Sequence, residues 1–159
     1  MTEAEALAVL QGPDPAAAAK AEAALWQLWS TSDDPEIERL FRSGVEAMER
    51  RDLAEAEQIF TRVIERAPGF AEGWNKRATV RYLADDHAGS IRDCEETLAR
   101  NPHHFGALSG EGLCHIALGQ FREAADLFRR ALAVHPHLDA VRENLRTVVA
   151  EVVKGNGQP

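Results

Sequence analysis

The chain has 159 residues, of which 45% are hydrophobic and 28% are charged, a composition typical of one folded domain and not of a disordered chain. Its formal net charge of −8 disfavours binding to the phosphate backbone of nucleic acids and to anionic membrane surfaces. Two cysteines are present, Cys94 and Cys114. They predict buried thiols in a reducing compartment, the cytoplasm or the interior of an organelle, and not a disulfide scaffold.

The N-terminal residues contain neither a basic leader nor a long apolar core, so we expect no signal peptide. A transit peptide removed earlier is equally compatible with this start. No apolar run approaches the roughly 20 residues that a membrane span needs, so we expect no membrane insertion.

Residues 1–35 differ from the rest of the chain and are predicted to form a helical cap. Thr2 and Glu5 have the spacing of a capping box, which favours a short helix over about residues 3–11. A Gly-Pro-Asp-Pro break follows, and its last aspartate and proline suit an N-cap and a first helical position. The alanine-rich run after the break predicts a second helix over about residues 16–29.

The apolar end of this second helix contains Trp26 and Trp29 and allows two interpretations. In the first, which we favour, the segment is a degenerate half-repeat that covers the helices directly after it. In the second, it folds as a self-ligand into a groove of its own chain or of a neighbouring molecule, since an exposed pair of tryptophans marks an interaction surface.

From residue 36 onward, one two-helix pattern recurs with a period of 34 residues. Each unit has a first helix with apolar residues at i, i+3 and i+4 spacing, a turn, a second amphipathic helix and a closing proline. The units span residues 36–69, 70–103 and 104–138.

Aspartates predict where the second helices of the first two units begin, at Asp52 and Asp86. The second unit is the weakest copy, because Arg77, Arg81 and Thr97 occupy positions that are more apolar in the other units.

Residues 139–154 are predicted to form one last helix, with valines and a leucine on one side and charged residues on the other. A helix at the end of a stack needs one face to bury and one face to keep hydrated. Residues 155–159 are expected to form a frayed tail.

Each unit resembles a tetratricopeptide repeat (TPR), a 34-residue helix-turn-helix module. The resemblance rests on small residues where the paired helices cross, small residues in the second helix, residues that plug the core between repeats, and closing prolines. The residues at the helix crossing are Gly44, Ala78 and Gly112, and the small residues of the second helix are Ala56, Ser90 and Ala124. The residues that plug the core between repeats are Phe60, Cys94 and Phe128, and the closing prolines are Pro68, Pro102 and Pro136.

The resemblance covers roughly residues 36–138, and within the family residues 73–136 resemble short three-repeat proteins of bacteria and plastids. It implies an all-α fold: a right-handed α-solenoid of stacked helix-turn-helix repeats with an N-terminal helical extension and a C-terminal capping helix. A single helical hairpin cannot bury both of its faces, so about three copies are needed for stability.

The resemblance also implies that the first helix of each repeat lines a concave groove, where a partner peptide or helix binds. The implied groove residues are Phe41, Val45, Met48 and Glu49; Asn75, Lys76, Thr79 and Tyr82; Ser109, Leu113 and Ile116; and Asn144, with Glu143 and Thr147 extending the far wall. For Leu113, packing between neighbouring helices is an equally good interpretation, whereas Phe41, Met48 and Tyr82 favour the groove.

One subset of the family holds a partner's C-terminal carboxylate with a clamp of lysines, asparagines and an arginine. At the matching positions this chain has Phe41, Val45, Lys76, Gly106 and Gly110. The clamp is therefore absent, which disfavours binding to the tail of a chaperone. We expect binding in the groove to depend more on apolar contact and less on salt.

Histidines in the turns are weak candidates for a metal site. His103 and His137 are equivalent in consecutive repeats, with His104 and His135 beside them, but no carboxylate or cysteine joins them at ligand spacing. We expect no metal and no cofactor. The sequence also lacks a nucleophile–base pair, a glycine-rich phosphate loop and an HExxH motif, so we expect no enzymatic activity.

The sequence thus predicts a protein-interaction adaptor or scaffold that binds a partner peptide or helix in its concave groove. The alternative is a structural assembly subunit that acts through its ends, its convex face or self-association. A third possibility is an accessory domain of a larger enzyme. We expect a monomer, with a homo-oligomer as the alternative.

Overall fold

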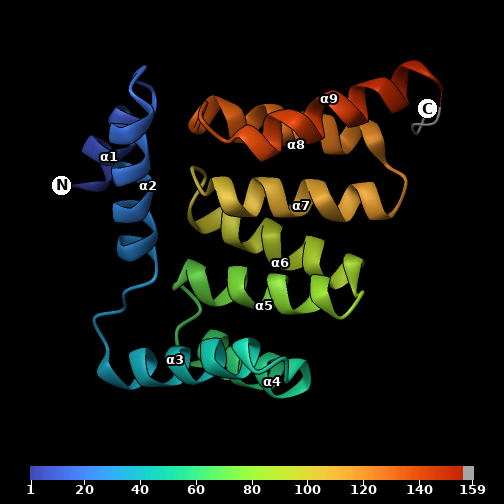
Figure 1. Ribbon diagram of the computed structural model, residues 1–159. Helices are drawn as coiled ribbons and strands as arrows, with labels where there is room; N and C mark the ends of the chain where they lie inside the picture. Colours follow the sequence, from blue (N-terminus) through green and yellow to red (C-terminus); the bar gives the residue numbers. More distant parts are fainter. Residues whose placement is uncertain (156–159) are drawn as a thin grey trace.

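The computed structural model describes residues 1–155, which form nine α-helices joined by short turns (Figure 1). The helices are α1 (Glu3–Leu10), α2 (Pro15–Trp29), α3 (Pro35–Glu49), α4 (Leu53–Arg66), α5 (Ala71–Leu83), α6 (His87–Arg100), α7 (Phe105–Ala117), α8 (Phe121–Val134) and α9 (Asp139–Val153). The prediction of an all-α solenoid of stacked hairpins is confirmed. Of the predicted tail, residues 156–159 lie outside the described residues.

Aspartate and threonine side chains cap five of the helices, and four of these caps are predicted above from the sequence. Thr2 and Glu5 form a reciprocal capping box at the start of α1, with N···O distances of 2.8 and 3.1 Å. The carboxylates of the other four caps each accept a hydrogen bond from a backbone N–H of the first turn; these caps are Asp14, Asp34, Asp52 and Asp86. Each such cap contributes about 1 kcal/mol to helix stability.

The turn inside each hairpin contains one residue in the left-handed region of backbone space. These residues are Arg51 (φ 65°), Asp85 (φ 64°) and Gly119 (φ 71°), spaced by the repeat period. Glycine adopts this conformation without strain, and aspartate adopts it more readily than most other residues, so Arg51 is the least favoured of the three. The three turns therefore keep one geometry although their sequences differ.

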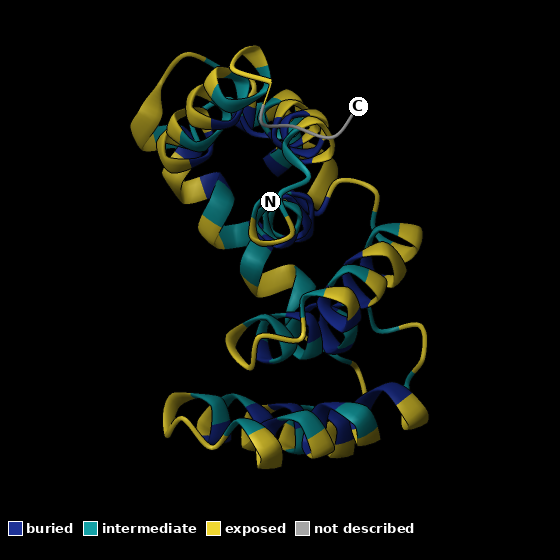
Figure 2. Ribbon diagram, turned by 90° about the vertical axis from the view of Figure 1, so that its right-hand side faces the viewer, coloured by how far each residue is buried: buried dark blue, intermediate teal, exposed yellow. Residues whose placement is uncertain are grey.

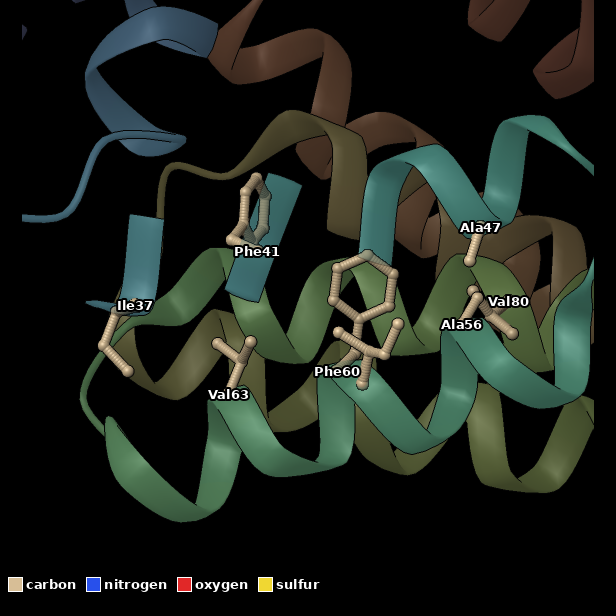
Figure 3. Close-up of a cluster of buried hydrophobic side chains, with 8 residues drawn as sticks. Ile37, Phe41, Ala47, Ala56, Phe60, Val63 and Val80 are labelled. Atoms are coloured by element: carbon tan, nitrogen blue, oxygen red, sulfur yellow. The ribbon is translucent and has the colours of Figure 1, made fainter. Parts of the chain in front are cut away.

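The paired helices of the first and third repeats cross so closely that only glycine fits at the crossing. A Cβ atom on Gly44 would lie 2.6 Å from Cε1 of Phe60, and one on Gly112 would lie 2.5 Å from Cε1 of Phe128. Both phenylalanines are fully buried. Figure 3 shows Phe60 at the centre of the apolar cluster between α3 and α4.

The second repeat joins its helices through charge as well as apolar contact. Asp93, which is 1% exposed, accepts hydrogen bonds from Nε and Nη2 of Arg77 at 2.9 and 2.8 Å and from Nη1 of Arg81 at 3.1 Å. Arg77 also donates to Oγ1 of Thr61 on α4, at 3.2 Å. The arginines that make this repeat look weak in sequence are thus paired with a buried aspartate, a charge-assisted contact that is stronger than a neutral one.

The N-terminal helices pack across the third repeat. In Figure 1, α2 runs beside the N-terminal ends of α5, α7 and α9 and not along α3. Its apolar cluster, which includes Leu10 and Leu25, also contains Phe105, Val134 and Leu138. The expectation that this segment is a half-repeat covering the first repeat is therefore wrong. Its alanine-rich face lets α1 and α2 pack on each other, and its aromatic end finds a partner surface at the start of α7.

Exposed residues follow the outer faces of the stacked helices, and buried residues follow the lines where the helices meet (Figure 2). None of the helices in residues 1–155 is long and apolar enough to cross a lipid bilayer.

The glycines of α7 provide a matched test of this packing. Gly112→Leu is expected to lower the free energy of unfolding by about 3 kcal/mol or more, because the new side chain collides with the ring of Phe128. In Gly110→Ala the new Cβ meets nothing closer than Sγ of Cys94 at 3.9 Å. This second change should raise the free energy of unfolding by about 0.5–1 kcal/mol through helix propensity.

Chemical denaturation followed by circular dichroism measures both changes. If Gly112→Leu unfolds at the same denaturant concentration as the wild type, the assigned helix crossing is incorrect.

Candidate functional site

A pocket of about 120 Å³ opens between α5, α6 and α7, among the positions that the sequence assigns to the groove. Its lining residues are Asn75, Ala78, Thr79, Tyr82, Ser90, Cys94, Gly106, Gly110 and Leu113. The alanine, the cysteine, the glycines and the leucine give it apolar walls, and the asparagine, threonine and tyrosine add polar groups.

The pocket exists because three side chains are small. Cys94 stands where the first and third repeats have Phe60 and Phe128, so the plug between repeats is smaller in the second repeat. On α7, Gly106 and Gly110 line the pocket without a side chain. A Cβ atom on Gly110 would face Cys94 at 3.9 Å, whereas one on Gly106 would meet the ring of Trp26. The gap is therefore built into the sequence of this repeat and does not depend on a movement of the helices.

The polar groups at the pocket are held by local hydrogen bonds. Asn75, which is 7% exposed, donates from Nδ2 to Oε1 of Glu72 at 2.7 Å, and Oγ1 of Thr79 donates to the carbonyl of Asn75 at 3.2 Å. The ring of Tyr82 lies edge-on to His87. Burial raises the pKa of the Cys94 thiol well above its usual value, so this sulfur stays protonated and is a poor nucleophile or metal ligand.

The structure brings four of the predicted groove residues together at this pocket: Asn75, Thr79, Tyr82 and Leu113. The sequence-based list missed the other lining residues. One signal was available, namely a cysteine at the position where the neighbouring repeats have phenylalanine.

Phe41 was assigned to the groove, and the structure corrects this. It is 7% exposed, and its ring packs on Phe60 and Phe70 with centroid distances of 5.7 and 5.4 Å (Figure 3). It belongs to the core of the first repeat because it lies opposite the plugging phenylalanine. Val45 and Met48 are half-buried beside the same cluster.

The remaining predicted residues lie outside the pocket. Glu49 is exposed, Ile116 packs on the core of the third repeat, and Oγ of Ser109 donates to the carbonyl of Phe105 at 2.9 Å. On α9, Asn144 is half-buried. Its neighbours Glu143 and Thr147 are exposed; Glu143 pairs with Arg146, and Thr147 donates to the carbonyl of Glu143 at 3.1 Å.

A buried polar bridge joins α5 to α7 next to the pocket. Glu72 and His104 are both 0% exposed, and Oε2 of Glu72 lies 2.8 Å from Nε2 of His104. Nδ1 of His104 accepts a hydrogen bond from the backbone N–H of Ala107 at 3.0 Å, so we assign the ring proton to Nε2, which donates to the carboxylate. One imidazole thus caps α7 and pairs with α5.

The N-terminal hairpin borders the same region. The ring of Trp26 lies against Gly106, and Nζ of Lys76 lies 5.9 Å from the centre of the Trp26 ring. The ring of Trp29 stacks on His104 with a centroid distance of 4.7 Å. Lys76 also lies 4.0 Å from Oε1 of Glu72.

The turn histidines take structural roles. Nε2 of His135 lies 2.5 Å from Oε1 of Glu22, and Nε2 of His137 lies 2.7 Å from the carbonyl of Gly12. His103 is exposed. Within residues 1–155, no group of three histidine, cysteine, aspartate or glutamate side chains is arranged to hold a metal ion.

Comparison with family models identifies the repeats. One tetratricopeptide-repeat model matches residues 41–104, and a second matches residues 105–138. The chain belongs to the tetratricopeptide-repeat family.

A TPR repeat-containing protein of Rhizobium etli is 29% identical over 128 residues, which cover 80% of this chain and 62% of the relative. A heat-shock protein cognate co-chaperone of Aspergillus fumigatus is 22% identical over 124 residues, which cover 77% of this chain and 36% of that protein. The chain thus spans less than two thirds of the length of either relative.

Solved TPR structures share the fold. The first TPR domain of Spaghetti (RPAP3), bound to the HSP90 peptide SRMEEVD, has a TM-score of 0.74 at 21% identity, over 76% of this chain and 96% of that chain. The Sgt2 TPR domain from Aspergillus fumigatus has a TM-score of 0.72 at 22% identity, over 79% of this chain and 87% of that domain. At these identities, the similarity establishes the fold alone.

One acidic group of this TPR protein lies on α7 outside the pocket and titrates abnormally. Glu111 is 8% exposed, and its Oε1 is buried without a hydrogen-bond partner. Burial, together with the nearby charge of Glu95, raises the pKa of Glu111 to about 7. The nearest cation-forming group on its own helix is His115, at 3.9 Å.

Glu111 predicts a stability that falls as the pH rises. Because the folded state holds this proton more tightly than the unfolded chain, the stabilisation is complete below about pH 4.5 and is lost as the pH passes through about 7. Glu111→Gln should therefore be more stable than the wild type by about 2 kcal/mol at pH 8 and equally stable at pH 4.5. Urea denaturation at both pH values measures this. The exposed Glu46→Gln is the control, and an equal gain in both variants would contradict the assignment to Glu111.

Proposed function

We propose that this TPR protein is an adaptor that binds a peptide or helix of a partner protein in its groove, with one apolar side chain of the partner entering the pocket at Cys94, Gly106 and Gly110. The observation that carries the proposal is the pocket itself, which lies among groove positions on two successive repeats. Apolar walls with a few polar groups nearby provide affinity and orientation respectively.

The size of the pocket favours a side chain over a cofactor. Sites for small molecules usually enclose roughly 300–1,000 Å³, whereas this pocket encloses about 120 Å³. Neighbouring polar side chains, such as those of Asn75 and Tyr82, offer hydrogen bonds to the backbone of a bound segment.

The ligand we propose differs from a chaperone tail. Among the similar structures, the RPAP3 domain is bound to an HSP90 peptide. This chain has Gly106 and Gly110 where the clamp residues of such domains are basic, and Trp26 covers Gly106. A segment bound by apolar contact, with little dependence on salt, fits these residues better. Both cysteines are free thiols, in keeping with the reducing compartment that the sequence predicts.

A second candidate is assembly through the C-terminal end of the stack. A cleft of about 300 Å³ between α8 and α9 has apolar and charged lining residues, and Val153 among them is 82% exposed. The lining residues are Arg122, Ala125, Asp126, Arg129, Val149, Val152 and Val153. An end with exposed valines beside charged side chains suits the docking of an amphipathic helix from another subunit. Light scattering separates the two candidates, because a mass that stays monomeric at all concentrations contradicts self-assembly.

Two kinds of variant test the adaptor proposal: one fills the pocket with a larger side chain, and the other removes side chains by substitution with alanine. Gly110→Leu should reduce capture of the partner from a lysate of the source organism at least 10-fold, because Gly110 lines the pocket and has room for a Cβ atom, so a longer side chain there fills the pocket. The Met48→Ala, Tyr82→Ala double variant should also weaken capture, because the sequence assigns both positions to the groove and Tyr82 lines the pocket. The control is Leu118→Ala, which changes an exposed leucine outside the pocket.

Quantitative mass spectrometry of the captured proteins provides the measurement, with circular dichroism confirming that each variant is folded. If all the variants capture the same proteins as the wild type, the groove is not the binding site.

A further inference from the structure

The aromatic end of α2 occupies a defined surface at the edge of the groove. We call this surface the α2 site: Lys76 on α5, His104 before α7, and Phe105 and Gly106 at the start of α7. Trp26 lies edge-on to the rings of His104 and Phe105, with centroid distances of 5.2 and 5.6 Å. Trp26 and Trp29 also contact each other edge-on at 5.8 Å.

The α2 site is shaped for an indole. A Cβ atom on residue 106 would lie 2.6 Å from Cη2 of Trp26, so glycine there is what lets the ring sit on the backbone of α7. Above the same ring lies the ammonium of Lys76, in a cation–π contact. His104 offers its flat face to Trp29, with an angle of 24° between the rings. Trp26 and Trp29, three residues apart on one helix, together contact the glycine, the lysine and the histidine of this site.

Besides the indoles, the hairpin contacts the third repeat through an apolar cluster and through hydrogen bonds. In the cluster, the buried Leu10 and Leu25 pack with Phe105, Val134 and Leu138. Nε2 of Gln11 donates to the carbonyls of Ala133 and Val134 at 2.9 and 2.7 Å. Glu22 and Gly12 meet histidines of the following turn. Water can replace these hydrogen bonds when the hairpin leaves, whereas the apolar cluster favours the docked state.

The docked hairpin also contains a hydrogen-bond donor without an acceptor. The Nε1–H of Trp29 is buried and has no partner. A buried donor without a partner weakens the docked state relative to a hydrated, open one. The five residues 30–34 between α2 and α3 let the hairpin leave its site while the chain stays connected.

We infer that the α2 site binds an α-helix bearing two aromatic side chains at positions i and i+3, and that α2 of this chain is its resident, displaceable ligand. Gly106 belongs both to this site and to the lining of the pocket. A partner helix that carries such an aromatic pair therefore competes with α2. The inference rests on the proposed function only for the location of the groove.

The test uses the chain's own hairpin as a probe, a fluorescein-labelled peptide of residues 2–31. In the wild-type protein the tethered hairpin competes at an effective concentration on the order of mM, so the probe should bind weakly. In the full-length Trp26→Ala, Trp29→Ala variant the resident ligand is weakened, so the probe should bind at least 10-fold more tightly. Fluorescence anisotropy measures both affinities.

Two controls isolate the indoles. The full-length Leu28→Ala variant changes an exposed leucine of the same helix and should bind the probe as weakly as the wild type does. A probe with both tryptophans replaced by alanine should bind to neither protein. If the double variant is folded and binds the normal probe no more tightly than the wild type, α2 is a fixed part of the fold and the inference is wrong.

Hydrogen exchange of the wild-type protein gives a second measurement that needs no variant. The amides of α1 and α2 should exchange at least 10-fold faster than those of α7, because the hairpin opens without the repeats. Equal protection of the three helices would overturn the inference. Neither experiment requires the partner, so the α2 site can fail while the dependence of partner capture on the pocket stands.

Discussion

The fold depends on how closely the two helices of each repeat approach. In the first and third repeats a phenylalanine on the second helix packs against a glycine on the first, with no room for even a methyl group. In the second repeat the same crossing brings together Ala78 and Cys94, which together fill less space. This departure from the repeated pattern is therefore also a place where a pocket opens.

The second repeat replaces the lost apolar packing with polar contacts that have fixed partners. On one side, the Arg77–Asp93 pair ties α5 to α6 and reaches α4 through Thr61. On the other side, the Glu72–His104 pair ties α5 to the start of α7. Buried pairs of this kind contribute less to stability than an apolar core of the same volume, but they tolerate little variation in geometry. They hold the helices in register around a cavity that would otherwise be expected to collapse.

Much of the fold was predictable because its determinants are local. Aspartates and prolines at helix starts set the boundaries, and the period of 34 residues set the order of the helices. The site was less predictable, because it depends on positions that lack a large side chain. Gly106 and Gly110 were noted only as absent clamp residues, and their role in shaping a pocket follows from their distance to Cys94 and Trp26 in space. The sequence assigns Phe41 to the groove because it lies on the first helix of its repeat. Its ring instead packs on Phe60, the phenylalanine that fills the core of the same repeat.

The position of the N-terminal hairpin could not be derived from periodicity, since a repeat pattern does not say where a segment outside the repeats will pack. Stacking α2 on the first repeat would continue the solenoid, yet the indoles of α2 find a better surface at the start of α7, where a glycine, a histidine face and a lysine lie together. Because the hairpin contacts the third repeat while its linker enters the first, it spans the stack and limits how far the repeats can separate. The docking of α2 on the third repeat therefore also ties the start of the first repeat to the third repeat.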